Sequence, residues 1–419
     1  MRKKNNAIIF YILIFLLELL LFRFASSDTT NFNKILIILV ILFNSIIIGG
    51  SLLKKSREDN KNIYFIIFLS YIIRTVVMAL DLLGYTSGFT GADTERFYNY
   101  AIYGVESSVN YINFLKAFFY IFGVSRVVAQ YFNVIVSLFS ILLLYKSMLI
   151  LNLKKSIITA TICIFAFSPP NILLSAALLR EPLMIFLNTL SLFLFLKWYK
   201  SGGLKYCILS IICIFISAWF HSGMISAIVL YCFVLPFYNR EKNKIIIKKN
   251  SLFIIIILFI GLFVSYMYFG KSLLSYFDRI NDVSDITARN SIGNTDYLNF
   301  LNNVTSIYMI LLFLPLKIFY FYFSPMPWDC YSISVACVFI FSSTIYIYLF
   351  YNILKKRSTN STLKKVMLLL LFSLSFVYAL GVSNAGTAMR HREKMLPFLL
   401  ITYAISNKKG KGDANENSF

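Results

Sequence analysis

The residues best suited to chemistry lie in short polar segments at the ends of long apolar runs. Residues 91–100 read GADTERFYNY and place Asp93, Glu95 and Arg96 ahead of three aromatic rings. A carboxylate there could accept a proton from a sugar hydroxyl or orient it, and aromatic rings stack on sugar faces. An alternative is that Asp93 only caps a short interfacial helix, whose positive end favours Glu95. The two roles can coexist, so all three charged residues are candidates for substrate contact.

A second segment reads LLREP and contains Arg180 and Glu181 directly before Pro182. Proline suits the first position of a helix, so both charges are expected at a helix start. The helix dipole favours Glu181 there but not Arg180. A cation beside a helix N-terminus is explained if an anion binds between them. The alternative is an arginine that reaches lipid head groups.

His221 lies in WFHSG, a tight turn between two apolar runs. Histidine can act as a general base near neutral pH, and the alternative is an interfacial histidine bonded to its own turn. With a reference pKa of about 6.5, a histidine suits neutral pH better than a solvated aspartate does. His221 is therefore favoured as the base, with Asp93 orienting the sugar. If the chain is closer to enzymes in which a loop carboxylate lies beside the acceptor, Asp93 is the base instead.

The last polar segment, residues 386–394, carries Arg390, His391 and Arg392 ahead of Pro397. Such a concentration of cations would match a phosphate or pyrophosphate, for which the planar fork of arginine is suited. The alternative is an anchor that fixes topology. A further cation, Arg74, falls near the middle of an apolar run with Asp81 seven residues later, and intramembrane charges usually face a bundle interior or a polar cavity.

The elements that position these residues are membrane-spanning helices. Hydrophobic residues make up 59% of the 419 residues and the mean hydropathy is +0.74. A helix needs about 20 residues to cross a bilayer. The sequence predicts an all-α protein with about twelve spans, at residues 7–22, 35–53, 63–83, 127–145, 157–176, 182–198, 206–220, 223–238, 251–269, 331–352, 366–383 and 395–406.

The charges between the runs predict the topology. Seven basic clusters alternate with acidic connections: Arg2–Lys4, Lys54–Lys61, Lys146–Lys155, Lys197–Lys205, Arg240–Lys249, Lys355–Lys365 and Lys408–Lys411. By the positive-inside rule these clusters and both termini are cytoplasmic. Two long loops, 84–122 and 270–306, are then external. The first run resembles a signal peptide, but Glu18 and the later runs favour a retained helix.

One run does not fit this alternation. The apolar stretch Ile307–Tyr322 is interrupted by Pro315 and Lys317, and a full crossing there would place Lys355–Lys365 outside. A re-entrant or interfacial segment is therefore expected. The chain is expected to form a single transmembrane domain over residues 1–406, followed by a cytoplasmic tail, 407–419.

Composition argues against several other classes of protein. The net charge is +22, but it is spread over short loops that suit anionic head groups better than a nucleic acid. The six cysteines lack metal-ligand spacing and the chain has two histidines. We therefore expect no nucleic acid, no metal and no cofactor.

The motifs resemble those of bacterial polysaccharide polymerases of the EpsG/Wzy type, within the GT-C-like membrane glycosyltransferases. Similar proteins carry an arginine at a span start, as at Arg180, and a Phe-His turn about forty residues later, as at His221. The segment around Asp93 resembles the first outer loop of GT-C enzymes, which often holds the catalytic base. Arg390, His391 and Arg392 resemble a late Arg-x-Arg…Pro stretch. This chain departs from the family pattern at two places. The acidic loop has Asp-Thr-Glu where the family has an adjacent Asp-Glu pair, and Arg180 is followed by Glu181 and Pro182 where a small or amide residue is common.

The resemblance implies a repeat-unit polymerase in the bacterial cytoplasmic membrane. Its substrate would be a polyprenyl-pyrophosphate-linked glycan, joined on the outer face during exopolysaccharide, capsule or O-antigen synthesis, with a flippase or chain-length regulator as a partner. His221, Arg180 and Arg390 are expected to face one outer cavity. Two alternatives remain: a GT-C transferase using a polyprenyl-monophosphate donor, and a lipid-linked oligosaccharide flippase. A flippase would usually show repeated halves and polar groups at the midplane.

Overall fold

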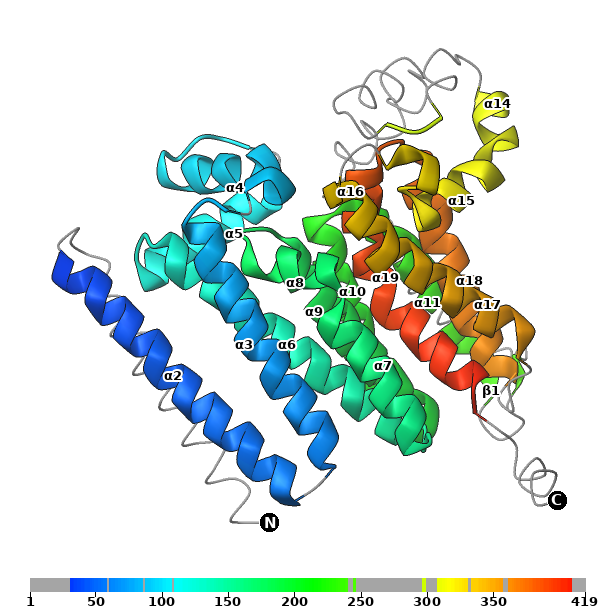
Figure 1. Ribbon diagram of the computed structural model, residues 1–419. Coiled ribbons are helices and arrows are strands. Elements are labelled where there is room, and N and C mark those ends of the chain that lie inside the picture. Colours follow the sequence, from blue (N-terminus) through cyan, green and yellow to red (C-terminus); the bar gives the residue numbers. More distant parts are fainter. Residues whose placement is uncertain are drawn as a thin grey trace. The chain divides into compact units, whose positions relative to one another are not determined.

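The computed structural model shows a helical protein (Figure 1). It describes residues 31–58, 60–85, 87–107, 109–239, 244–245, 296–298, 307–330, 333–356 and 361–408. The predicted spans at 7–22 and 251–269 lie outside these residues, as does most of the loop 270–306. The chain divides into two compact units, each described here by itself. Unit 1 comprises residues 1–142 and 171–186, and unit 2 comprises 143–170 and 187–419.

Unit 1 is built from the N-terminal helices, and α6, α8 and α9 each continue across its boundary. Its elements are α2 (Asn31–Glu58), α3 (Lys61–Leu82), α4 (Ser87–Ile102), α5 (Asn110–Phe122), most of α6 (Arg126–Ile150), α8 (Pro169–Ala176) and the start of α9 (Glu181–Ser201). Helix α2 packs along α3, and α4 packs on α5 (Figure 1). The predicted loop 84–122 is thus largely a pair of helices.

Unit 2 is organised around its last helix. Its further elements are α7 (Lys155–Phe167), α10 (Leu204–Phe220), η1 (Ser222–Met224), α11 (Ile225–Phe237), β1 (Tyr238–Asn239), β2 (Lys244–Ile245), α14 (Ile307–Leu312), α15 (Leu314–Phe323), η4 (Pro327–Asp329), α16 (Ile333–Val338), the π-helical turn η5 (Phe339–Ser343), α17 (Thr344–Lys355), α18 (Ser361–Leu380) and α19 (Ala385–Ser406). Helix α19 packs against α7, α15, α17 and α18, and residues 391–406 are all buried. The two strands pair antiparallel, with Tyr238 opposite Ile245.

The helices identify a multi-pass membrane protein. Four described helices are long and apolar enough to cross a bilayer: Lys61–Leu82, Arg126–Ile150, Glu181–Ser201 and Thr362–Leu380. A fifth span arises if α7 and α8, bent by 49° to each other, are counted together. Shorter apolar helices include Leu204–Phe220 and Phe339–Lys355. A helix in ten of the twelve predicted spans is therefore seen, whereas the count of twelve crossings stays a prediction.

Three predicted elements differ in detail. The run 157–176 is broken at Ser168, because Pro169 and Pro170 cannot continue the hydrogen-bonding ladder of α7. The run 331–352 is α16, η5 and α17 in succession. Helix α19 begins ten residues before the predicted span 395–406, because Asn384 caps it: its side-chain oxygen accepts from the Gly386 and Thr387 amides at 2.9 and 3.2 Å.

The irregular run Ile307–Tyr322 contains two short helices with a break at Phe313. Helix α15 has ten residues, about 15 Å of helix, which is half of a bilayer core. Pro315 lies in its first turn. The Lys317 ammonium is buried and donates to the Leu380 carbonyl at 2.9 Å, at the C-terminus of α18. A cation at a helix C-terminus is stabilised there, so this lysine links α15 to α18. The expectation of a re-entrant or interfacial segment stays a prediction.

Candidate functional site

Unit 2 brings the chain's two histidines into contact. His221 follows α10 and His391 lies in the second turn of α19, and their ring centroids are 4.7 Å apart at 65°. Tyr378 of α18 stacks on His391 at 4.6 Å and lies 5.4 Å from His221. We call His221, Tyr378, His391 and Lys394 the histidine cluster.

A glycine makes this contact possible. A Cβ atom on Gly223 would lie 2.6 Å from Cε1 of Tyr378, far inside van der Waals contact. The absence of a side chain lets the His221 turn approach α18. Close packing against Tyr378 therefore explains the glycine in the His-Ser-Gly segment.

Hydrogen bonding fixes which ring nitrogen of His221 can carry a proton. Nδ1 of His221 accepts from the Gly223 backbone N–H at 3.2 Å. A backbone N–H can only donate, so Nδ1 keeps its lone pair and the neutral ring carries its proton on Nε2. In this geometry His221 presents an N–H donor. The arrangement favours binding an anion over accepting a proton, and the predicted role of His221 as a base stays a prediction.

Lys394 adds a cationic group to the cluster. It is fully buried and its Nζ lies 3.1 Å from Nδ1 of His391. An ammonium in that position donates to Nδ1, which again leaves the Nε2–H of His391 as a donor. Asn188 of α9 donates to the Lys394 carbonyl at 2.9 Å and so fixes this turn of α19.

Arg392 and Glu393 are buried in the interior of unit 2. Arg392 donates from Nη1 to the carbonyls of Tyr322 and Ser324 at 2.8 and 2.6 Å, and from Nη2 to Ser342 Oγ at 2.7 Å. Its guanidinium also lies 5.0 Å from the Tyr346 ring centroid. These bonds join α15, η5 and α19, so the contacts of Arg392 are internal ones. Its predicted role as a substrate ligand stays a prediction.

Glu393 accepts from Ser168 Oγ at 3.2 Å and from the Tyr346 hydroxyl at 3.3 Å. Arg390, by contrast, is partly exposed and lies one residue before His391. Of the two predicted arginine ligands on α19, Arg390 is therefore the one accessible to a substrate. The charged segment expected as a loop is helix because Arg392 and Glu393 find partners on other elements, whereas Lys394 bonds His391 within α19.

In unit 1 the predicted acidic loop is part of helix α4. Asp93 is the seventh residue of that helix, so the interpretation of Asp93 as an N-cap is wrong; the helix begins earlier, at Ser87. Asp93 accepts from Arg96 Nη2 at 2.7 Å, and both side chains are substantially exposed. Asp93 remains accessible to a substrate hydroxyl.

Glu95 belongs to a network that the sequence analysis did not identify. Arg126, the first residue of α6, forms an ion pair with Glu95 and lies 3.7 Å from the buried carboxylate of Asp81. Gln130, one turn further along α6, donates to Asp81 Oδ2 at 2.6 Å. Burial, opposed by the Arg126 charge, raises the pKa of Tyr98. The sequence feature that could have indicated this network is the pair Arg126 and Gln130, four residues apart at the start of an apolar run.

The start of α9 agrees with the predicted position of Glu181, which is the first residue of the helix. Nε of Arg180 lies 3.9 Å from Glu181 Oε1. Asn133 of α6 donates to the carbonyls of Ala177 and Leu179 at 2.8 and 3.0 Å, which holds the preceding turn. This turn is built by long-range bonds, as a binding site requires.

Arg74 is fully buried in α3, where Nη1 donates to the Ser70 side chain within the same helix. Its position in a bundle interior is as expected.

The candidates Asp93, Glu95, Arg96 and Arg180 belong to unit 1, whereas His221, Arg390, His391 and Arg392 belong to unit 2. The expectation that His221, Arg180 and Arg390 face one cavity stays a prediction.

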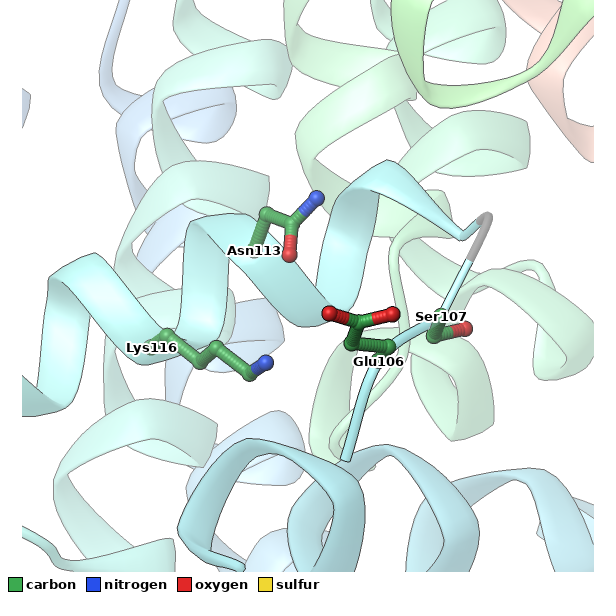
Figure 2. A pocket seen from close by; sticks show the side chains of 4 residues that line it. All are labelled: Glu106, Ser107, Asn113 and Lys116. Atoms are coloured by element: carbon green, nitrogen blue, oxygen red, sulfur yellow. The ribbon is translucent and has the colours of Figure 1, made fainter. Parts of the chain in front are cut away.

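A separate open cavity of about 440 Å³ lies in unit 1 beside the connection between α4 and α5 (Figure 2). It is lined by Glu106, Ser107, Asn113 and Lys116. Lys116 donates to the Val105 carbonyl at 3.1 Å, so it closes the connection onto α5. Within the described residues, no three His, Cys, Asp or Glu side chains lie together as a metal site needs.

Comparison with known proteins identifies no relative: no protein-family model, no curated protein and no solved structure matches this chain.

Proposed function

We propose that this protein is a membrane glycosyltransferase that joins polyprenyl-pyrophosphate-linked repeat units on the outer face of a bacterial cytoplasmic membrane. The observation that carries the proposal is the histidine cluster with Arg390 beside it at the start of α19. Two imidazole N–H donors, an ammonium and an accessible guanidinium suit the oxygens of a phosphate or pyrophosphate. A multi-pass helical bundle suits a substrate with a lipid tail.

The basic clusters support the orientation. Lys408 donates to the Leu151 carbonyl at 2.7 Å, and Lys356 bonds Asn407 Oδ1. Burial, and after it the charge of the nearby Lys200, lower the pKa of Lys408. Four of the seven predicted cytoplasmic clusters thus meet at the C-terminal end of α19. The histidines lie near its other end, and α19 has 22 residues, about 33 Å. By the positive-inside rule the histidine cluster is external.

Each residue then has a role in the proposed transfer. His221 and His391 bind the leaving pyrophosphate through their Nε2–H groups, and Arg390 is the accessible fork. Lys394 holds His391 in the tautomer that donates from Nε2. Asp93 accepts the proton of the acceptor hydroxyl, because the hydrogen bond at Nδ1 of His221 favours a donor there. Glu95, Arg96 and Arg180 contact the substrate. The acceptor oxygen forms a bond to the sugar's anomeric carbon as the carbon–oxygen bond to pyrophosphate breaks.

The test is carried out in cells that lack the native gene, with matched membrane levels of each variant. Arg390→Lys and Asp93→Asn should abolish long polymer while lipid-linked single repeat units accumulate on the outer face, where an impermeant lectin detects them. Arg392→Lys is the structural comparison: before expression is matched, it should lower the amount of folded protein. Lysine lacks the planar fork that bonds Tyr322 O, Ser324 O and Ser342 Oγ together, and each buried acceptor left without its donor costs about 1–3 kcal/mol.

The same assay separates the alternatives. Intact single repeats confined to the inner face would replace the polymerase proposal with a flippase. Repeat units that lack one sugar would instead indicate a GT-C transferase with a monophosphate donor. Full-length polymer from Arg390→Lys and Asp93→Asn would remove both residues from the site.

A further inference from the structure

Four lysines from different elements lie around the C-terminal end of α19. Lys408 donates to Leu151 O, and Lys364 donates to the carbonyls of Ile353 and Lys356 at 2.5 and 2.8 Å. Lys356 donates to Asn407 Oδ1. We call Lys200, Lys356, Lys364 and Lys408 the lysine cluster.

The carboxylates in the described part of unit 2 are bonded away from the lysine cluster. They are Asp296, Asp329 and Glu393. Asp296 bonds Asn384 at the start of α19, and Glu393 bonds Tyr346 and Ser168 in the interior. Asp329 bonds the Met326 amide in η4. The ion pairs that the structure describes all lie in unit 1.

Helix dipoles offset part of this positive charge. The C-termini of α6, α9, α17 and α19 end near these lysines, and each helix end carries roughly half a negative charge. Lys364 lies in the first turn of α18, whose N-terminus carries roughly half a positive charge. Four lysines and this N-terminus against four C-terminal ends leave roughly 2.5 positive charges. Burial and the neighbouring Lys200 lower the pKa of Lys408, which is the consequence expected of cations held in close proximity.

An apolar surface adjoins the lysine cluster. Tyr351 and Leu354 of α17 are 57% and 78% exposed, directly before Lys355 and Lys356. Lys355 Nζ donates to the Tyr351 hydroxyl at 2.9 Å. A phosphate group beside exposed apolar side chains at the end of a membrane helix matches a phospholipid, with its head on the lysines and its chains along α17.

We propose that the lysine cluster is a binding site for an anionic phospholipid of the cytoplasmic leaflet, a second site that is separate from the histidine cluster and independent of the proposed polymerase activity. A diphosphate head group such as that of cardiolipin fits the remaining charge best. A soluble nucleotide or pyrophosphate has the phosphate chemistry but would make no use of Tyr351 and Leu354.

The experiment uses the purified full-length protein in a neutral detergent, with lipid binding counted by native mass spectrometry. The variant is K356Q/K364Q/K408Q and the matched control is K54Q/K55Q/K61Q, which removes three exposed lysines from the last turns of α2 and the start of α3. We expect cardiolipin to bind the native chain and the control equally and the variant at least tenfold more weakly. Phosphatidylcholine should bind all three alike.

A charge-preserving variant guards against a folding defect. K356R/K364R/K408R should retain cardiolipin binding within about twofold if charge rather than lysine geometry holds the lipid. Equal cardiolipin binding by K356Q/K364Q/K408Q and by its control would overturn the proposal, since the attraction would then be diffuse. Displacement of cardiolipin by inorganic pyrophosphate at a concentration equal to that of the lipid would also overturn it, in favour of a soluble anion.

Discussion

The contact between His221, Tyr378 and His391 depends on one missing side chain. Gly223 lies beside the Tyr378 ring with no room for a Cβ. The two histidines come from residues 170 positions apart, and their contact is set by how α10, α18 and α19 pack. Sequence could identify each histidine as a candidate at a helix end, but it could not show that they touch, because no local pattern encodes that distance.

Gly223→Ala is therefore expected to destabilise the protein. The added methyl must displace the buried Tyr378 ring, and overpacking of this kind costs about 1–3 kcal/mol. Thermal unfolding of the purified protein in detergent measures the effect. Gly50→Ala is the control, because Gly50 lies within helix α2 with nothing within 4 Å of its added Cβ.

Alanine at Gly50 should be neutral or stabilise by up to about 1 kcal/mol, since alanine favours a helix more than glycine does. Equal unfolding temperatures for the two variants would show that the His221 turn relaxes without cost. A second comparison, Gly223→Ala with Tyr378→Leu, should recover part of the loss because the smaller side chain vacates the contact.

At the scale of elements, the apolar runs predicted most helices and misplaced the start of one. Hydropathy identified α3, α6, α9 and α18 because lipid and core both require apolar residues there. It missed the first half of α19, where Arg390–Lys394 reads as a polar loop. Those charges are compatible with a buried helix only because Tyr322, Ser342 and Tyr346 supply long-range partners, and such partners are invisible to a local window.

The attachment of α4 is another property that the sequence did not reveal. Arg126 bonds Glu95 of α4 and approaches Asp81 of α3, so one guanidinium joins three helices. Asp81 is 2% exposed in its side chain, and losing the partner of a buried charge costs far more than losing an exposed pair. Arg126 is thus a positioning residue for the helix that carries Asp93.

Arg126→Gln should loosen α4, and Arg96→Gln should not. The Arg96–Asp93 pair is exposed on both sides and is expected to contribute at most about 1 kcal/mol. Hydrogen–deuterium exchange of the peptides covering α4 checks this, with faster exchange expected only in Arg126→Gln. Unchanged exchange in both variants would mean that α4 is held by its packing on α5 alone.

At the scale of the whole molecule, composition and charge predicted the class of protein: a multi-pass helical membrane protein. The alternation of basic clusters predicted that these clusters share one side of the membrane, and in unit 2 four of them meet at the C-terminal end of α19. Cations also lie beside the histidines near the other end of α19, namely Arg390, Arg392 and Lys394. The side of the membrane on which each end lies therefore stays a prediction. The expectation that candidates of unit 1 and unit 2 face one cavity stays a prediction, because loop charges assign a side of the membrane and not a tertiary contact.

The final prediction tests the orientation of α19. The variants are made in a chain with all six cysteines replaced by serine. Thr387→Cys places a thiol at an exposed position in the first turn of α19, and Lys355→Cys places one at the exposed end of α17. Both residues belong to unit 2, and the lysine cluster adjoins only the second. Because lysine-rich ends stay cytoplasmic, a membrane-impermeant maleimide added to intact cells should label the Thr387→Cys protein. It should leave the Lys355→Cys protein unlabelled until the membrane is opened. The reverse labelling would put the histidine cluster on the cytoplasmic side, where a soluble nucleotide-sugar donor could reach it, and would remove the basis for an external polymerase.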